Sequence, residues 1–339
     1  MIGNEDSIFS HFPFRDFSRR GGRVFLKGLS KMSGDEALEL LVGLRTYQLT
    51  RLVRIRGEEK IHSLKEDLFS FAGQLMGRFD EKFSHQVETA RKRFDWNVAS
   101  LEQIAEEERA RLKGLEPQEI RNQLRQELAA ISGERFSPDE EVLERKMIAE
   151  IAEAYKIDTS FRSMEAVEKD IFSRFLRELA DRIQNQLAQL KPEETTKVEE
   201  KLFESLSKMS ESDRDIMKRE LNLAELSERQ VLNVIRTEGS SLVSRMVGEG
   251  QDGYGIYLTL TAATHAVFTT LMGISLPFAF YSAMATLVGF LLGPLGIALI
   301  TVGGGSYFYK RAQREYNAQL LAFALVSLTV KEKWGQAEV

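Results

Sequence analysis

The chain has 339 residues, no cysteine and a formal net charge of −5. The lack of cysteine excludes disulfides and thiolate chemistry and is typical of a protein in a reducing cytosol. Residues 1–13 include Glu5 and Asp6 and contain no apolar run, so no secretory signal is expected. No alternating pattern of the strand type runs for a useful length, and the sequence therefore predicts an all-α fold.

Charge is unevenly distributed along the chain. Residues 1–65 have a net charge of +4, residues 310–339 have +2, and residues 253–309, the charge-free stretch, contain no Asp, Glu, Lys or Arg. By difference from the total of −5, residues 66–252 carry −11. These changes divide the chain into four predicted parts. Residues 1–60 form a basic N-terminal segment, and residues 61–250 form an acidic cytosolic domain of long helices. Residues 251–309 form a membrane hairpin, and residues 310–339 form a C-terminal amphipathic helix.

The basic N-terminal segment interleaves phenylalanines with arginines. Arginine beside aromatic rings can hold phosphates and stack bases, so this segment predicts a nucleotide or single-stranded nucleic-acid regulator. The same chemistry suits an anionic membrane surface, and a solvated basic face over ordinary core phenylalanines is the third interpretation. The candidate ligands for an anion are Arg15, Arg19, Arg20, Arg23, Arg51, Arg54 and Arg56.

A ten-residue segment occurs twice. Residues 24–33 and 201–210 share the sequence Leu-Ser-Lys-Met-Ser at their ends, and an acid follows three residues later in each copy, Glu36 and Asp213. A serine followed by an acid three residues on is the capping-box spacing that begins a helix. We therefore predict a short helix, a capped turn and a second helix, used twice in the chain.

Two long amphipathic helices are predicted between these copies. Apolar residues recur every three or four positions over residues 64–101 and again over residues 164–190, where Pro192 ends the pattern. Their apolar stripes need a partner, either each other or another copy of the chain. The charged run that includes Glu106, Glu107, Glu108, Arg109 and Arg111 is predicted to be a solvated helix face.

The charge-free stretch is the strongest functional signal in the sequence. A bilayer core needs about 20 mostly apolar residues per helical span, so this stretch is long enough for two spans and a turn. Pro277 separates the predicted spans, Ile256–Leu276 and Phe278–Val302, and Gly293-Pro294 kinks the second. The prediction is a C-terminal transmembrane helical hairpin; alternatively, Leu295–Tyr309 forms a separate short helix.

Threonine and serine recur through the charge-free stretch. Their hydroxyls can bond back to their own helix in lipid, but they also suit a wet lumen. A second interpretation of the whole stretch is a hairpin that is buried inside a soluble helical shell and inserts only on activation. This alternative differs from a constitutive span in what surrounds the apolar side chains, protein or lipid.

Basic residues flank the charge-free stretch on both sides. This fits an even number of spans with both ends cytoplasmic, and hence a place in the inner, cytoplasmic membrane. Residues 316–330 form a further uncharged run of 15 residues, which is short for a span and predicts a core or interfacial helix. The flanking residues are Arg236, Arg245, Lys310, Arg311 and Arg314.

Small residues and one histidine mark the predicted hairpin. Ala285, Gly289 and Gly293 are spaced by four, which favours close helix packing or self-assembly, although such residues are also frequent in membrane segments. His265 would tune conduction if it faced a lumen, but we favour a neutral, hydrogen-bonding residue that faces another helix. The candidate pore or packing residues are thus Ala285, Gly289, Gly293, Pro294 and His265.

The C-terminal part of the chain resembles a known family. Four features carry the resemblance: the hairpin from Leu206 to Asp213, the glycine-rich entry at residues 248–255, the Gly-Pro-Leu-Gly sequence at residues 293–296 and the Tyr- and Arg-rich closing helix. Together they resemble the bacterial YaaW-type family over roughly residues 200–330. That resemblance implies no catalytic residues. The layout is also similar to the Hailong-type antiphage channel effectors, which implies a nucleotide-gated channel.

Patterns for catalysis are missing from the sequence. There is no phosphate-binding loop, and His11, His62, His85 and His265 are not paired at metal-ligand spacing. We therefore expect neither an enzyme nor a cofactor or metal.

The predicted function is an oligomeric pore or ion channel effector embedded in the membrane. Its cytosolic helical domain would hold it closed and gate it, with a nucleotide or oligonucleotide signal in antiviral defence as the trigger. The expected partners are the lipid bilayer, further copies of the chain and that regulator. The alternative is a non-conducting, membrane-anchored helical scaffold or chaperone-like protein.

Overall fold

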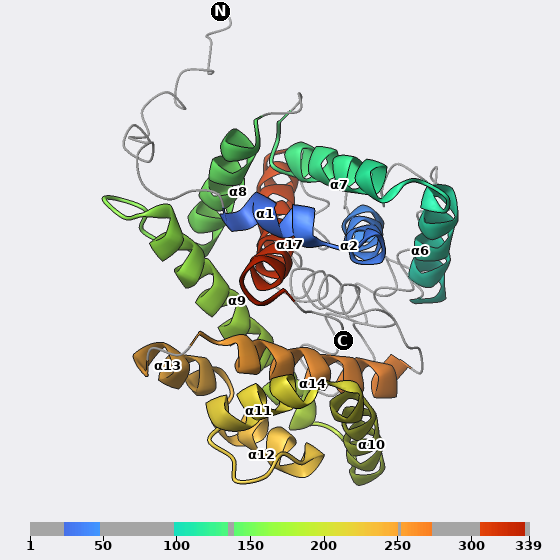
Figure 1. Cartoon of the computed structure of the whole chain (residues 1–339), viewed down its shortest axis with the longest axis vertical. Coiled ribbons are helices and arrows are strands. Elements are labelled where there is room, and N and C mark those ends of the chain that lie inside the picture. Colours follow the sequence, from blue (N-terminus) through green and yellow to red (C-terminus); the bar gives the residue numbers. More distant parts are fainter. Residues whose placement is uncertain (1–23, 48–97, 135–138, 250–251, 273–305, 336–339) are drawn as a thin grey trace, which may run out of the picture.

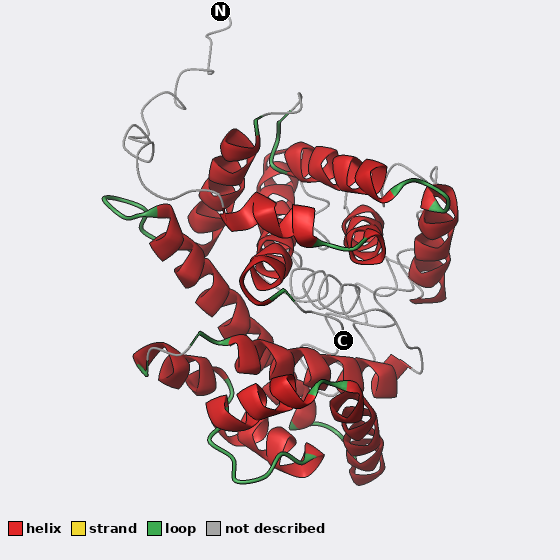
Figure 2. Cartoon of the chain, viewed as in Figure 1, coloured by secondary structure: helices red, strands yellow, loops and turns green. Residues whose placement is uncertain are grey.

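A computed structural model describes residues 24–47, 98–134, 139–249, 252–272 and 306–335. These residues form twelve helices and no strands, which confirms the predicted all-α class (Figure 2). The helices are α1 (Val24–Lys31), α2 (Gly34–Tyr47), α6 (Val98–Leu112), α7 (Pro117–Ile131), α8 (Glu140–Tyr155), α9 (Met164–Leu187), α10 (Pro192–Lys208), α11 (Glu211–Glu220), α12 (Glu228–Glu238), α13 (Ser240–Gly248), α14 (Tyr254–Met272) and α17 (Ser306–Trp334).

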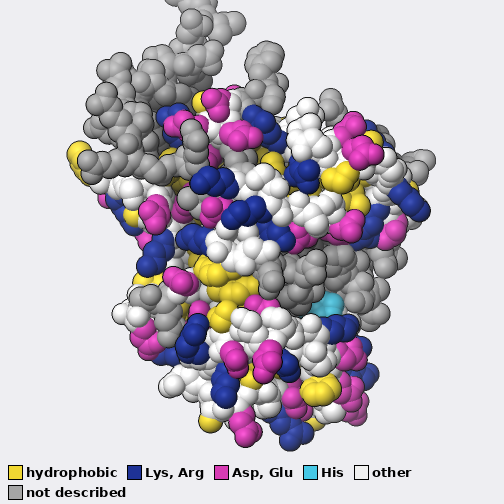
Figure 3. Space-filling model, viewed as in Figure 1, with side chains coloured by type: hydrophobic (Ala, Val, Ile, Leu, Met, Phe, Trp, Pro, Cys, Tyr) yellow, Lys and Arg dark blue, Asp and Glu magenta, His cyan; other side chains and the backbone are white. Residues whose placement is uncertain are grey.

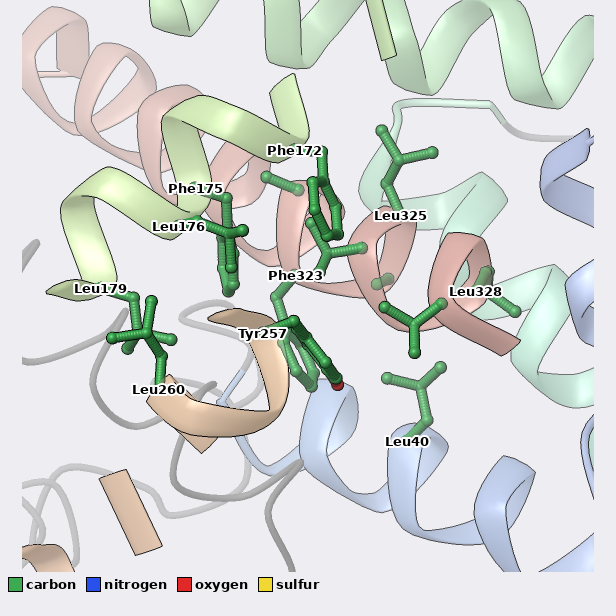
Figure 4. Packing of buried hydrophobic residues seen from close by; sticks show 14 of the residues in the cluster. Leu40, Phe172, Phe175, Leu176, Leu179, Tyr257, Leu260, Phe323, Leu325 and Leu328 are labelled. Carbon is green, nitrogen blue, oxygen red and sulfur yellow. The ribbon is translucent and has the colours of Figure 1, made fainter. Parts of the chain in front are cut away.

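Helix α9 joins two groups of helices. It packs against α8 and α17 on one side and against α12, α13 and α14 on the other. In Figure 1, α1, α2, α7 and α8 lie around α17 and α6 lies to the right of α2, whereas α10, α11 and α12 lie below α14 and α13 lies to its left. One continuous core runs through both groups, and Figure 4 shows Phe172 of α9, Tyr257 of α14 and Phe323 of α17 converging within it.

The second long helix is confirmed. Its periodic residues Val167, Ile171 and Ile183 are buried, and its first turn is capped by the Ser163 hydroxyl, which accepts from the Ala166 amide at 3.2 Å. Helix α9 ends at Leu187, just before the predicted limit, and Pro192 begins α10. The other predicted long helix, residues 64–101, lies outside the described residues except for its last four positions.

Both copies of the repeated segment adopt the predicted structure. The Glu36 amide donates to Ser33 Oγ at 3.2 Å, and the Asp213 amide donates to Ser210 Oγ at 3.1 Å, so each second helix begins with the same cap. The last turns of the first helices also correspond, because Ser30 and Ser207 donate to the backbone three residues earlier at 2.8 and 2.9 Å. The five shared residues thus encode one local structure twice.

Each copy covers a different apolar helix. The α1–α2 hairpin packs on α17 through α1, whereas the α10–α11 hairpin packs on α14 through both of its helices. The backbone of α1 comes very close to α17 at Gly28, where an added Cβ would overlap the carbonyl oxygen of Leu328. Gly28 is therefore required by this contact, and Ser205 is the small residue at the same place in the second copy.

The predicted solvated face on residues 106–111 is wrong for two of its members. Glu108 is buried, and Arg109 makes a bidentate pair with Glu39 of α2, with both N to O distances 2.8 Å. Glu106, Glu107 and Arg111 are exposed, as expected of a charged run. Glu108 and Arg109 are shielded from solvent because α6 packs against α2. There, Arg45 of α2 pairs with Glu108, and Glu39 of α2 pairs with Arg109.

Within the described ranges, no helix combines the length and apolar character needed to cross a membrane. The first predicted span, Ile256–Leu276, corresponds to α14 as far as Met272, and the side chains of this helix are mostly buried in the protein. The second predicted span, residues 278–302, lies outside the described residues. Residues 316–330 form part of α17 and are mostly buried, so the predicted core helix is confirmed at this place.

Candidate functional site around the charge-free helix

Helix α14 is enclosed by other helices over most of its surface. It packs against α9, α10 and α11, and all residues from Tyr254 to Thr264 are buried. On the face in Figure 3, acidic and basic side chains are interspersed over the surface, so the helices that cover α14 present charge to solvent. Transferring the large apolar side chains of α14 into water would cost on the order of 10 kcal/mol.

Three threonine hydroxyls buried in α14 are satisfied by the helix itself. Thr259, Thr261 and Thr264 donate their hydroxyls to the carbonyl oxygens of Gly255, Tyr257 and Leu260, each at 2.6 Å. A threonine that bonds back to its own helix takes its hydrogen bond with it wherever the helix moves. These three hydroxyls therefore make α14 compatible with either a protein core or lipid.

The N-terminal end of α14 is held by α11. Glu220 is buried and accepts from the amide of Ile256 at 3.1 Å and from the amide of Gly255. A Cβ on Gly255 would lie 2.9 Å from the carbonyl oxygen of Ile216, so only glycine allows this close approach. The Tyr254 phenol is hydrogen-bonded to Asp213. We call this arrangement of Asp213, Glu220, Tyr254 and Gly255 the clasp.

Aromatic rings fasten the clasp to the rest of the molecule. The Tyr254 ring stacks on Trp334 of α17, with centroids 4.9 Å apart and planes 13° from parallel. Phe172 of α9 lies 6.2 Å from Trp334 and 6.5 Å from Tyr257 between ring centroids. Such ring pairs contribute about 0.5–1.5 kcal/mol each beyond the area that they bury. The N-terminal end of α14 is thus fixed by three other helices, α9, α11 and α17.

His265 lies near charged side chains of α10. It is half-buried, and burial lowers its pKa from the ordinary 6.5. Lys208 and Lys201 of α10 lower the pKa further, whereas Glu204 of the same helix raises it. His265 is therefore held as neutral imidazole beside two lysines at neutral pH.

Acid should weaken the packing of α14 through His265. Because the native pKa lies below 6.5, the unfolded chain binds a proton more readily, and native stability falls as the pH drops through 6.5. Between pH 7.5 and 5.5, we expect wild type to lose more unfolding free energy than His265→Gln. The difference between the two losses should be below about 1 kcal/mol, because water screens the partly exposed site. Urea unfolding of both proteins at both pH values measures this, and equal losses would contradict it.

A second titratable cluster joins α9 to its neighbours. Glu144 of α8 and Glu168 of α9 are both buried, and their side chains are hydrogen-bonded. Burial and, next in size, the Glu144 carboxylate raise the pKa of Glu168 to about 8, while Lys333 of α17 opposes the rise. The two carboxyls therefore share a proton at neutral pH, because two adjacent buried charges are costly.

Alkali should destabilise the protein through this carboxyl pair. The native state keeps a proton on Glu168 that the unfolded chain loses above pH 4.5, so this stabilisation disappears as the pH rises through about 8. We expect the free energy of unfolding of Glu168→Gln, relative to that of wild type, to be about 2–4 kcal/mol higher at pH 9 than at pH 5. Thermal or urea unfolding measures the gain. Glu200→Gln, an exposed change on α10, should show no such gain.

Most of the predicted site residues cannot be placed. The candidate packing residues Ala285, Gly289, Gly293 and Pro294 lie outside the described residues, as do all seven candidate anion ligands, Arg15, Arg19, Arg20, Arg23, Arg51, Arg54 and Arg56. Among the described residues, no group of three or more acidic or histidine side chains is arranged to hold a metal ion.

The clasp and the carboxyl pair were not predicted from the sequence. Asp213 is predicted only as the acid that follows the cap of α11, where its amide donates to Ser210 Oγ, and nothing in the sequence marks its contact with Tyr254. Glu168 lies among the apolar positions of the α9 stripe, next to Val167, and an acid there is the only sequence signal of a buried carboxyl. Glu220 carries no local signal, because its partner amides belong to a helix that is distant in sequence.

Comparisons with known proteins provide no family for this chain. No family model, no curated protein and no solved structure matches it.

Proposed function

We propose that the protein is a membrane-acting effector that forms an oligomeric pore or ion channel and keeps its charge-free stretch within a helical shell until a signal releases it. The effector would act at the inner membrane with its N-terminal domain and C-terminus in the cytoplasm. A nucleotide or single-stranded nucleic acid bound by the N-terminal arginines would be the trigger, and antiviral defence the setting.

The observation that carries this proposal is the character of α14. It is a 19-residue helix without a charged side chain, it is enclosed by amphipathic helices, and its buried threonines bond to its own backbone. A helix with these properties loses few hydrogen bonds when protein is exchanged for lipid. The cost of exposing it to water keeps it inside the shell unless lipid is present.

Site-directed fluorescence tests the proposal. The chain has no cysteine, so a Leu271→Cys variant labelled with bimane carries one probe on α14. Vesicles of phosphatidylethanolamine and phosphatidylglycerol that contain nitroxide lipids and potassium are mixed with the protein at neutral pH, at pH 5.5 and with a short single-stranded oligonucleotide. We expect nitroxide quenching and potassium release to rise together in at least one of these conditions.

The matched control carries the same label on the outer face of α10. Glu200 is exposed, so a bimane at Glu200→Cys should remain unquenched while Leu271→Cys is quenched. Equal quenching of both probes would indicate unfolding on the membrane. No quenching of the α14 probe in any condition would favour the second candidate, a non-conducting helical scaffold, in which α14 is a permanent core helix. The burial of α14 against three helices is the observation that supports this second candidate.

A further inference from the structure

The two ends of α14 differ in how firmly they are held. Every residue from Tyr254 to Phe268 is buried except the half-buried His265, whereas Thr269, Thr270 and Leu271 at the C-terminal end are only half-buried. The N-terminal end is tied to α11 by the clasp and to α17 by the Tyr254–Trp334 stack. The constraints therefore become weaker from the N-terminal to the C-terminal end of the helix.

The C-terminal half of α14 also contains unfavourable features. The Thr270 hydroxyl is buried and has no hydrogen-bond partner among the described residues, which costs about 1–3 kcal/mol relative to a satisfied group. Lys201 and Lys208 of α10 act on a protonated His265 as like charges, and Glu204 of the same helix offsets them in part. Opening this half would relieve both features, whereas opening the N-terminal half would break the clasp.

We infer that α14 leaves the helical shell from its C-terminal end and that the clasp at its N-terminal end stays closed and acts as the hinge. This inference rests on the proposed function, since it specifies how the proposed release is regulated. A half-open state is cheaper than complete ejection, because the buried side chains near Tyr254 keep their contacts with α9, α11 and α17.

Acidification acts in opposite directions at the two ends. Lys208, Lys201 and Glu204 of α10 shift the pKa of His265, and a proton on His265 adds a third positive charge to those of Lys201 and Lys208. At the clasp, burial raises the pKa of Glu220. The folded protein therefore gains stability relative to the unfolded chain as the pH falls and Glu220 takes up a proton. The neutral carboxyl still accepts from the Ile256 amide. Arg219 and Asp252 also face Glu220, with opposite effects on its pKa. Mild acid should thus loosen the C-terminal end and preserve the hinge.

Amide hydrogen exchange on the full chain in water tests the inference without any membrane. We expect protection factors for residues 266–271 to be at least tenfold lower than those for residues 256–260, which would exchange only with global unfolding. The difference should grow between pH 7.5 and 5.5 in wild type and should not grow in His265→Gln. Equal protection at the two ends, or lower protection at residues 256–260, would overturn the inference.

Variants of the clasp provide the matched comparison. Glu220→Ala should speed exchange at residues 256–260 and leave residues 266–271 unchanged, which would reverse or abolish the gradient. Tyr254→Phe removes only the phenol that bonds to Asp213 and serves if Glu220→Ala does not fold. An unchanged gradient in a folded clasp variant would show that the clasp is not the hinge. The result of the vesicle experiment does not depend on the result of hydrogen exchange. Failure of the proposed function and failure of the hinge can therefore be distinguished.

Discussion

Gly28→Ala is expected to destabilise the protein by about 3 kcal/mol or more. The new methyl group would overlap the Leu328 carbonyl oxygen and would also lie 2.8 Å from the Leu328 carbonyl carbon. Both are backbone atoms of a long helix, so no side-chain rotation can relieve the overlap, and α1 must move away from α17. A lower urea midpoint with an unchanged slope would report this loss of stability.

Gly248→Ala is the matched control for this substitution. Gly248 is also helical, in the last turn of α13, but a Cβ added there meets no atom within 4 Å. Because alanine is a better helix former than glycine, this variant should be neutral or more stable by up to about 1 kcal/mol. A Gly28→Ala protein as stable as Gly248→Ala would mean that α1 does not rest on α17 in solution.

The repeated hairpins show what the sequence could predict. Capping depends on residues three positions apart, and the buried positions recur at helical spacing, so all the necessary information is local. The spacing from Ser33 to Glu36 and from Ser210 to Asp213 therefore gave the correct helix starts. The sequence could not show which helix each hairpin covers, because α17 and α14 are distant in the chain.

The charge-free helix shows why the surroundings of a helix could not be predicted. A helix buried on all sides in protein and a helix in lipid both lack charged residues, and neither has a polar face. Composition and periodicity are therefore the same for both environments. What distinguishes them in α14 is the clasp, whose members Asp213 and Glu220 come from another helix.

The charged run on α6 was misassigned for a related reason. Glu108 and Glu106 have the same local sequence context, and only the tertiary partner Arg45 makes one of them a buried residue. A buried charge needs an opposite charge. The exposed Arg111 of the same helix, 3.5 Å from Glu108, does not by itself indicate burial, whereas the nearly buried Arg45 comes from another helix. Tertiary ion pairs of this kind are thus the part of the fold that the sequence conceals.

The buried ion-pair network around Arg45 leads to the second large prediction. Arg45 of α2 contacts Glu127 of α7 at 2.8 Å and Glu108 of α6 at 3.5 Å, and it donates to Gln123 of α7 at 3.0 Å. All three charged side chains are buried or nearly so. Arg45 therefore holds α2, α6 and α7 together at a place where water cannot replace it.

Arg45→Ala should destabilise the protein by about 3–5 kcal/mol, because it leaves two buried carboxylates without their shared cation. Arg45→Lys should recover only part of this loss, since an ammonium cannot make the forked contacts of a guanidinium. The control is Arg229→Ala, which breaks the exposed pair with Glu199 and should change stability by less than about 0.5 kcal/mol. Urea unfolding at pH 7 ranks the three variants. An Arg45→Ala variant no weaker than Arg229→Ala would contradict the packing of α2 against α6 and α7, because those two carboxylates would then be solvated.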